Sequence, residues 1–104
     1  MTNNIKLLIE FLGGLDSIFD NKRTYSVEVD NDKIKTLKDL IFDYIVKELL
    51  VKPEDNYSIY IQDETIRPGI LTLINDVDWE LEEELDYVLQ NRDVISFTST
   101  LHGG

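Results

Sequence analysis

The sequence predicts an α+β fold in which one main helix packs on one face of a mixed β-sheet. Three features indicate this class. Apolar and polar residues alternate near both ends of the chain, as in half-buried strands. Residues 37–50 instead show apolar side chains at helical spacing. Since one helix cannot cover both faces of a sheet, we expect two layers.

Two alternating runs, residues 5–11 and 25–29, predict the first two strands. Between them, Gly13-Gly14 and the polar residues 20–22 are turn signals. We therefore expect a hairpin with a long connection. The apolar residues expected on its buried face are Ile5, Leu7, Ile9, Phe11, Tyr25, Val27 and Val29.

The predicted helix covers about residues 37–50. Thr36 precedes it and Asp39 lies three residues further on, which is a start similar to a capping box, with aspartate in place of the usual Glu or Gln. Pro53 prevents the helix from continuing. The apolar stripe of this helix consists of Leu37, Leu40, Ile41, Tyr44, Ile45 and Leu49.

Three more strands are predicted at residues 57–61, 70–74 and 94–98, with a turn at 66–69 and an irregular segment at 75–92. The apolar anchors expected in the irregular segment are Trp79, Leu81, Leu85, Tyr87 and Leu89. The residues expected to be buried together are Ile5, Leu7, Leu40, Ile41, Ile59, Ile95 and Phe97.

The first and last strands are the most apolar, so we expect them side by side in the centre of the sheet. A hairpin, a crossover helix and a sheet closed by the last strand form the β-grasp arrangement. The predicted organisation is a single domain at residues 1–99 followed by a flexible tail at residues 100–104, where two glycines and little apolar surface oppose ordering.

The amino-acid composition excludes several kinds of functional site. The 104 residues include no cysteine, which excludes disulfide scaffolds, thiolate metal sites and cysteine nucleophiles. A net charge of -11 argues against direct nucleic-acid binding and fits either a basic protein partner or high solubility. No apolar run reaches the length of a membrane span, and the N-terminus does not read as a signal peptide, so we expect a cytoplasmic protein.

Two features toward the C-terminus, a single histidine and an acidic cluster, could suggest a metal site. The single histidine, His102, without any cysteine does not favour a metal site. An acidic cluster resembles a calcium loop at its start, but Leu81 stands where that loop requires glycine. The cluster is either a solvated face or a docking surface for a basic partner. Its members are Asp76, Asp78, Glu80, Glu82, Glu83, Glu84 and Asp86.

Four stretches resemble the ubiquitin-related modifier family, in matching order over nearly the whole chain. They are IEFLGGLD (9–16), IRPGILTLINDVDWELE (66–82), DYVL (86–89) and ISFTSTLHGG (95–104). Two departures stand out. The turn before the last strand reads NRD (91–93) where the family usually carries glycine, but Asn91 can tolerate a left-handed conformation, so we expect the turn to be kept. Residues 82–85 are also unusually acidic.

The resemblance implies a ubiquitin-like sulfur carrier and protein modifier, with a ubiquitin-like fold. An ATP-dependent activating enzyme with sulfurtransferase activity would adenylate the carboxylate of Gly104 and convert it to a thiocarboxylate. A tRNA thiolation enzyme would use the sulfur for 2-thiolation of the wobble uridine, and the same C-terminus could be joined to lysines of target proteins. The residues implied to contact the activating enzyme are Thr100, Leu101, His102 and Gly103.

The same resemblance implies no catalytic residue, cofactor or metal on this chain, with ATP and magnesium held by the activating enzyme. It also implies a cytoplasmic monomer that can be nuclear. The tail residues suit this role, because an α-carboxylate is anionic at neutral pH and glycine fits a channel too narrow for side chains. Five extended residues from Thr100 to Gly104 reach roughly 17 Å.

Three other functions compete with this one. A ubiquitin-like interaction module would not need to end at Gly104. A small enzyme or inhibitor is disfavoured by the absence of cysteine and the single histidine. A prokaryotic-type carrier for molybdopterin or thiamine synthesis would share the fold and the tail, but the four stretches favour the eukaryotic family.

Overall fold

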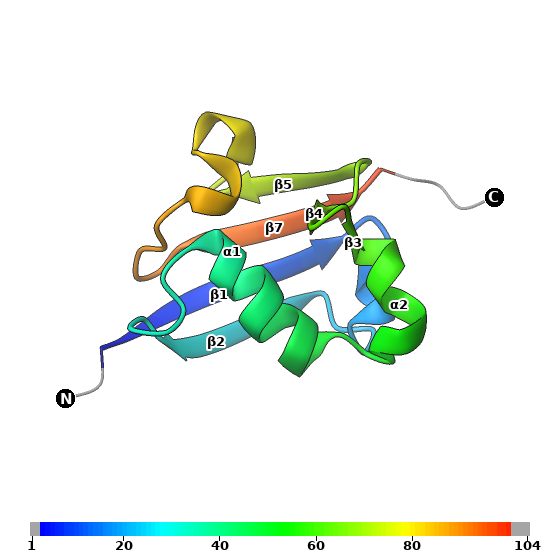
Figure 1. Ribbon diagram of the computed structural model, residues 1–104, viewed down its shortest axis with the longest axis horizontal. Helices are drawn as coiled ribbons and strands as arrows, with labels where there is room; N and C mark the ends of the chain where they lie inside the picture. The colour runs from blue at the N-terminus through cyan, green and yellow to red at the C-terminus, as the bar shows by residue number, and fades with distance from the viewer. Residues whose placement is uncertain (1–2, 101–104) are drawn as a thin grey trace.

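A mixed five-stranded sheet carries the main helix across one face (Figure 1). The structure is a computed structural model, and it describes residues 3–100. The order of the strands across the sheet is β2-β1-β7-β5-β6, which confirms the predicted α+β class. These strands are β1 (Asn4–Leu12), β2 (Thr24–Asp30), β5 (Ile70–Ile74), β6 (Val77–Asp78) and β7 (Val94–Ser99).

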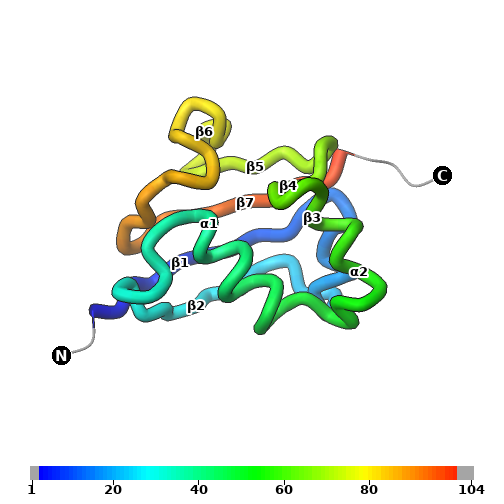
Figure 2. The backbone as a smooth tube through the Cα atoms, in the orientation of Figure 1, coloured from blue at the N-terminus to red at the C-terminus, as the bar shows by residue number. Residues whose placement is uncertain are grey.

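The first and last strands lie side by side near the middle of the sheet, as predicted. β1 and β7 are parallel, with Ile9 opposite Ile95 and Phe11 opposite Phe97, and these four side chains are fully buried. Figure 2 shows the two strands running together through the centre of the molecule. The burial pattern of β1 alternates, so one face of this strand packs in the core.

The long connection of the first hairpin contributes to the core. β1 and β2 pair antiparallel from Asn4 with Asp30 to Glu10 with Thr24. The connection contains a short 3₁₀ helix, η1 (Leu15–Ile18), whose Leu15 and Ile18 are buried. Phe19 then stacks on Phe11, with 3.7 Å between ring centroids. The connection therefore closes one end of the core as well as joining two strands.

The main helix begins and ends where the sequence predicts. It starts as α1 (Leu37–Asp39) and continues as η2 (Leu40–Leu49), where the winding loosens to i→i+5 hydrogen bonds. The predicted capping box is present: Asp39 N donates to Thr36 Oγ1 at 3.3 Å, and Thr36 N donates to Asp39 Oδ2 at 3.1 Å. Within residues 3–100, no helix is long and apolar enough to cross a membrane.

The strand predicted at residues 57–61 is wrong. Helix α2 (Pro53–Tyr60) occupies most of this stretch, and only β3 (Ile61–Gln62) follows it, paired with β4 (Thr65–Ile66). Proline at the first helical position and two acidic residues in the first turn favour the helix locally. As a result Ile59, predicted in the core, is 41% exposed, and Tyr60 is buried instead.

Two tight hairpins were not foreseen. Asp63-Glu64 joins β3 to β4, and Asn75-Asp76 joins β5 to β6. All four residues have positive φ, as a two-residue type I′ turn requires. Asn75 makes such a turn easy, because asparagine tolerates the left-handed region.

The rest of the predicted irregular segment forms two short helices, η3 (Trp79–Leu81) and η4 (Glu84–Asp86). Of the predicted anchors, Leu89 is buried, and Trp79, Leu85 and Tyr87 are partly buried against the core. Leu81 is 78% exposed, so its prediction as an anchor is wrong. Nothing packs over this position, because Leu81 closes a single turn at the edge of the sheet.

A buried carboxylate holds these outer turns to the sheet. Asp93 accepts hydrogen bonds from Asn75 Nδ2 at 2.9 Å, from the Tyr87 hydroxyl at 2.7 Å and from Gln90 N at 2.8 Å. Burial, and then the hydrogen bond and charge of Asp93, raise the pKa of Tyr87 above its ordinary value, so this hydroxyl stays a donor. Asp93 thus joins the β5–β6 turn at Asn75 to the segment from Tyr87 to Asp93.

The turn before β7 is present without glycine. Arg92, not Asn91, takes the left-handed conformation, with φ of 73°. Asn91 instead accepts a hydrogen bond from Lys6 N on its side-chain oxygen, at 2.8 Å. The turn therefore accommodates the absence of glycine by placing the strain on the residue whose side chain is free to point into solvent.

The centre of the core contains two polar atoms without a partner. The Tyr60 hydroxyl and Thr72 Oγ1 are both buried and make no hydrogen bond within the part of the chain that the structure describes. Tyr60 packs edge-on against Phe19 and Phe97. Burial raises the pKa of Tyr60 well above its ordinary value, because the phenolate would have no solvent around it.

We predict that Tyr60→Phe increases the free energy of unfolding by about 1 kcal/mol, because it removes a buried donor that has no acceptor. The variant should also resist alkaline pH better. A folded-state pKa above the unfolded value makes stability fall as pH rises past the unfolded tyrosine pKa of about 10, and phenylalanine does not titrate. Urea denaturation at pH 7 and pH 10.5 measures both effects.

Tyr25→Phe is the matched control. The Tyr25 hydroxyl donates to Phe19 O at 2.8 Å, so its removal should lower stability by about 1 kcal/mol. If Tyr60→Phe destabilises the protein as much as Tyr25→Phe does, then the Tyr60 hydroxyl has a partner in solution.

Candidate functional site

The strand β7 ends beside two turns that fix how the chain leaves the sheet. Ser99, its last residue, pairs with Ile70 at the start of β5, and Thr98 pairs with Leu12 at the end of β1. The chain therefore leaves the sheet at the end of the strands at which β1 ends and β5 begins (Figure 1). We call the residues around this exit, Gly13, Gly69, Ser99 and Thr100, the tail base.

One side of the tail base is an anchor formed by Thr100 and Gly69. Thr100 donates two hydrogen bonds to the carbonyl oxygen of Gly69, one from its backbone N at 2.8 Å and one from its hydroxyl. Gly69 has φ of 100°, which a residue with a Cβ rarely adopts. The predicted turn at residues 66–69 is confirmed in position, and it holds the first residue after β7.

On the other side of the tail base, Gly13 lies close to the backbone of Ser99. A Cβ at Gly13 would lie 2.3 Å from the carbonyl oxygen of Ser99, and φ at this glycine is 67°. Both the contact and the conformation therefore require glycine. The sequence indicated only a turn here, although a glycine pair directly after a strand is a signal for close backbone approach as well.

Shallow cavities lie on both sides of the exit. One, of about 260 Å³, is lined by Gly13, Ser99 and the exposed Ile59, among others. The second, of about 270 Å³, is lined by Gly69, Thr100, Ile70 and Leu71, and Leu71 is 40% exposed. A partner that takes hold of the tail would meet this partly apolar surface beside it.

The predicted site residues are only partly within the described structure. Thr100 lies at the tail base, and Leu101, His102, Gly103 and Gly104 lie outside the described residues. The acidic cluster occupies the β5–β6 turn, β6, η3 and η4, which are separate from the tail base. Among residues 3–100, no three His, Cys, Asp or Glu side chains are grouped as a metal site would need.

The tail base contains no ionisable side chain, since its members are two glycines, a serine and a threonine. General acid–base chemistry needs a titratable group placed at the reacting atoms. The arrangement of these four residues can hold and orient the chain where it leaves β7.

Comparisons with known proteins agree over the full length of the chain. Residues 6–104 match the model of the family Urm1 (Ubiquitin related modifier). A curated relative from Saccharomyces cerevisiae (strain YJM789), Ubiquitin-related modifier 1, is 54% identical over 100 residues, covering 96% of this chain and 99% of the relative.

Solved structures share the fold. The solution structure of Urm1 from Trypanosoma brucei superimposes with a TM-score of 0.76 at 31% identity, and the match covers 100% of each chain. A chain of the Amycolatopsis orientalis BexX/CysO complex gives a TM-score of 0.68 at 13% identity, over 94% of this chain and 99% of that one. The second likeness concerns the fold alone.

We predict that Gly13→Ala moves the tail base. Its methyl group would overlap the Ser99 carbonyl, so that backbone must shift, and the left-handed φ adds a cost of about 1–3 kcal/mol. Amide resonances of Ser99 and Thr100 should move, and the free energy of unfolding should fall.

Gly14→Ala separates the two causes. Gly14 also has positive φ, of 88°, but a Cβ there meets nothing within 4 Å. It should therefore lower stability through backbone conformation alone and leave the Ser99 and Thr100 resonances in place. Equal shifts of these resonances in the two variants would contradict a direct contact between Gly13 and the tail base.

Proposed function

Because this chain belongs to the Urm1 (Ubiquitin related modifier) family, we propose that the carboxylate of Gly104 is activated by another enzyme and carries sulfur. A member of this family is a ubiquitin-like modifier and sulfur carrier on which enzymes act, and it is not itself an enzyme. The tail base has the matching character, since it holds the tail and offers no titratable group for catalysis.

One observation supports this proposal most directly: Thr100 is fixed to Gly69 at the start of the tail. Four residues follow that anchor, and fully extended they span at most about 14 Å. The carboxylate would therefore reach no farther than this from the anchor at the end of the sheet. An enzyme that docks on the folded part could place it in a deep active site without unfolding this chain.

The proposed reaction has two steps. A carboxylate oxygen of Gly104 attacks the α-phosphorus of ATP, which breaks the α–β phosphoanhydride bond and releases pyrophosphate. In the second step, a cysteine persulfide of the activating enzyme attacks the acyl carbon through its outer sulfur and AMP leaves, which gives an acyl disulfide. A second thiol of that enzyme then attacks the cysteine sulfur, breaks the sulfur–sulfur bond by forming an enzyme disulfide, and releases the terminus as a thiocarboxylate. The activating enzyme supplies ATP, magnesium and sulfur, so this chain needs no cofactor of its own.

The proposed uses of the product follow from its chemistry. A thiocarboxylate can pass its sulfur to a tRNA thiolation enzyme for 2-thiolation of the wobble uridine. An activated acyl group can instead form an isopeptide bond with a lysine of a target protein. We propose both uses, for a monomer that acts in the cytoplasm and can enter the nucleus.

We predict that deleting Gly104 abolishes activation without affecting folding. The deletion moves the carboxylate back by about 3.4 Å, while reacting atoms must approach within roughly 3–3.5 Å. The melting temperature should not change, because the core ends before the tail. The rate of pyrophosphate release with the cognate activating enzyme should fall by at least 100-fold, in line with the cost of a 1 Å misplacement.

An extension by one alanine after Gly104 is the companion variant. It keeps every native residue but moves the carboxylate forward, so it should fail as the deletion does. Intact mass of the wild-type product should show sulfur in place of one oxygen. Comparable rates for all three proteins would mean that the tail is not the reactive group, and an interaction module would then be the better description.

A second prediction concerns the encounter with that enzyme. With a net charge of -11, the chain should associate faster with a basic docking surface at low salt. We expect the association rate constant to fall at least tenfold between low and 0.5 M ionic strength, as screening shortens the range of attraction. Stopped-flow association of the two proteins measures it, and a rate constant independent of salt would show that the acidic surface plays no part.

A further inference from the structure

A groove on the helix-bearing face is separate from the tail base. Two adjoining cavities form it, of about 370 Å³ and about 280 Å³, and they share Lys38 and Leu85 in their walls. We call it the helix-side groove. Its lining residues come from the main helix, α2, the β3–β4 hairpin and the segment around η4, and none belongs to the tail base.

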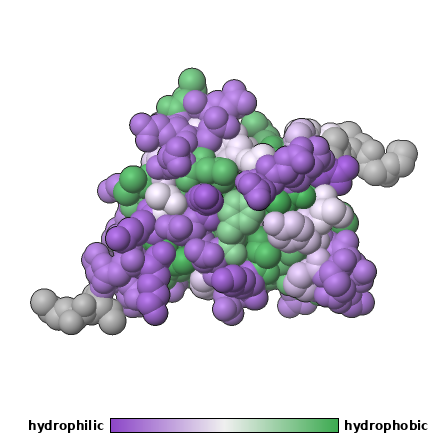
Figure 3. Space-filling view, in the orientation of Figure 1, coloured by the Kyte–Doolittle hydropathy of each residue, from purple (hydrophilic) through white to green (hydrophobic). Residues whose placement is uncertain are grey.

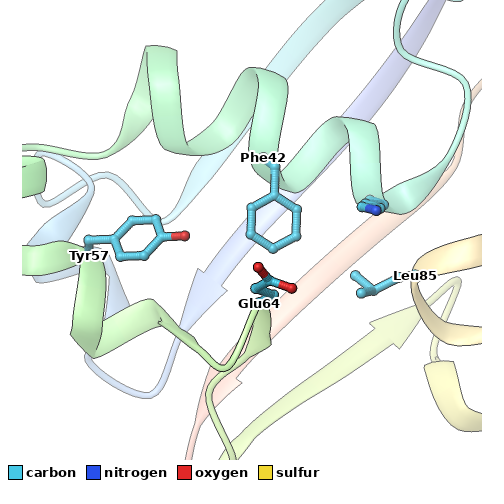
Figure 4. Close-up of a pocket in the computed structure, with 5 residues that line it drawn as sticks. Phe42, Tyr57, Glu64 and Leu85 are labelled. Atoms are coloured by element: carbon cyan, nitrogen blue, oxygen red, sulfur yellow. The ribbon is translucent and has the colours of Figure 1, made fainter.

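The floor of the helix-side groove is apolar. In Figure 4, Phe42 projects from the main helix toward Glu64, with Tyr57 on one side and Leu85 on the other. The Tyr57 side chain is 41% exposed, and Phe42 and Leu85 are partly buried against the core. Figure 3 shows apolar surface in the middle of this face, surrounded by hydrophilic side chains.

The rim of the helix-side groove is acidic. Glu64 stands at the first cavity, and Glu83, Glu84 and Asp86 stand at the second, with Lys38 between them as the one cation of the lining. Within residues 3–100, none of these four carboxylates has a cationic partner within 4 Å. Their charge is therefore available to a molecule that enters the groove.

We propose that the helix-side groove docks a basic segment of a partner protein, in which an apolar side chain lies between lysines or arginines. The apolar side chain would fill the floor between Phe42, Tyr57 and Leu85, and the cations would meet the rim. A cavity of about 370 Å³ is large enough for this purpose, since binding pockets begin at roughly 300 Å³.

The charge of the groove selects among occupants. Nucleic acids and anionic membranes would be repelled by four unpaired carboxylates. A second copy of this chain would bring a net charge of -11 to the same surface, so self-association here is disfavoured. A cationic protein segment gains from both the rim and the floor.

This surface goes beyond the proposed function, because it needs neither Gly104 nor activation. A chain lacking Gly104 should bind through the groove as well as the full chain does. The failure of sulfur carriage and the failure of groove binding are therefore separate results.

The test uses the full-length, ¹⁵N-labelled protein and a synthetic hexapeptide, acetyl-Lys-Arg-Leu-Phe-Lys-Arg-amide, titrated at low salt and followed by amide resonances. We expect shifts concentrated at residues 38, 42, 57, 64 and 85. A peptide with Gly-Ser in place of Leu-Phe should bind more weakly, because it leaves the apolar floor empty. A peptide with acidic residues in place of the basic ones should not bind.

Paired charge reversals test the rim. Glu83→Lys with Glu84→Lys should weaken binding of the basic hexapeptide by about five- to tenfold, as expected for the loss of two exposed pairs and gain of repulsion. Asp32→Lys with Glu48→Lys changes net charge equally on exposed positions outside the groove and should change binding less than twofold. Glu64→Gln is a milder rim variant if the double reversal disturbs folding.

Several outcomes would overturn the proposal. Equal weakening by the two double variants would show that only net charge matters. Equal binding of the Leu-Phe and Gly-Ser peptides would show that the floor is not used. Shifts centred on the opposite face of the sheet, at residues 8, 71 and 94, would place the docking surface elsewhere.

Discussion

The parallel pairing of β1 with β7 is the constraint on which the rest of the molecule depends. It pairs a strand near the beginning of the chain with one near its end, and Ile9, Phe11, Ile95 and Phe97 of these two strands are fully buried. Because parallel strands point the same way, the turn after β1 and the residue after β7 leave the sheet at the same end of the strands. The tail base exists because of this pairing: Gly13 can touch Ser99 only when both strands end together.

The residues that position the tail differ from the residues that carry charge. The core holds β7 still, Gly13 and Gly69 shape the exit, and Thr100 fixes where the tail begins. Each of these residues fixes the position of the backbone, and a glycine or a side-chain hydroxyl is sufficient for that. The carboxylates of the acidic cluster lie elsewhere, on the rim of the helix-side groove and along the turns between β5 and η4, apart from the tail base.

The sequence predicts what depends on local pattern. The capping box at Thr36 and Asp39 and the strands with clear alternation follow from residue spacing, and the central pair follows from the apolar content of the first and last strands. Ile59 was misplaced because alternation over five residues outweighed the helix start at Pro53. The role of Gly13 and the helix-side groove could not be predicted, because each joins segments far apart in the chain whose contact depends on the complete fold.

The pairing of β1 with β7 also determines how the molecule resists mechanical force. The start of β1 and the end of β7 lie at opposite ends of the sheet, and β7 is hydrogen-bonded on one side to β1 and on the other to β5 (Figure 1). A force that pulls the ends apart acts along β1 and β7, so it loads their hydrogen bonds in shear, all together, instead of opening them one after another. Forced unfolding is governed by the unfolding rate. A force applied at the start of β1 and the end of β7 would therefore meet greater mechanical resistance than a force applied to an outer strand such as β6.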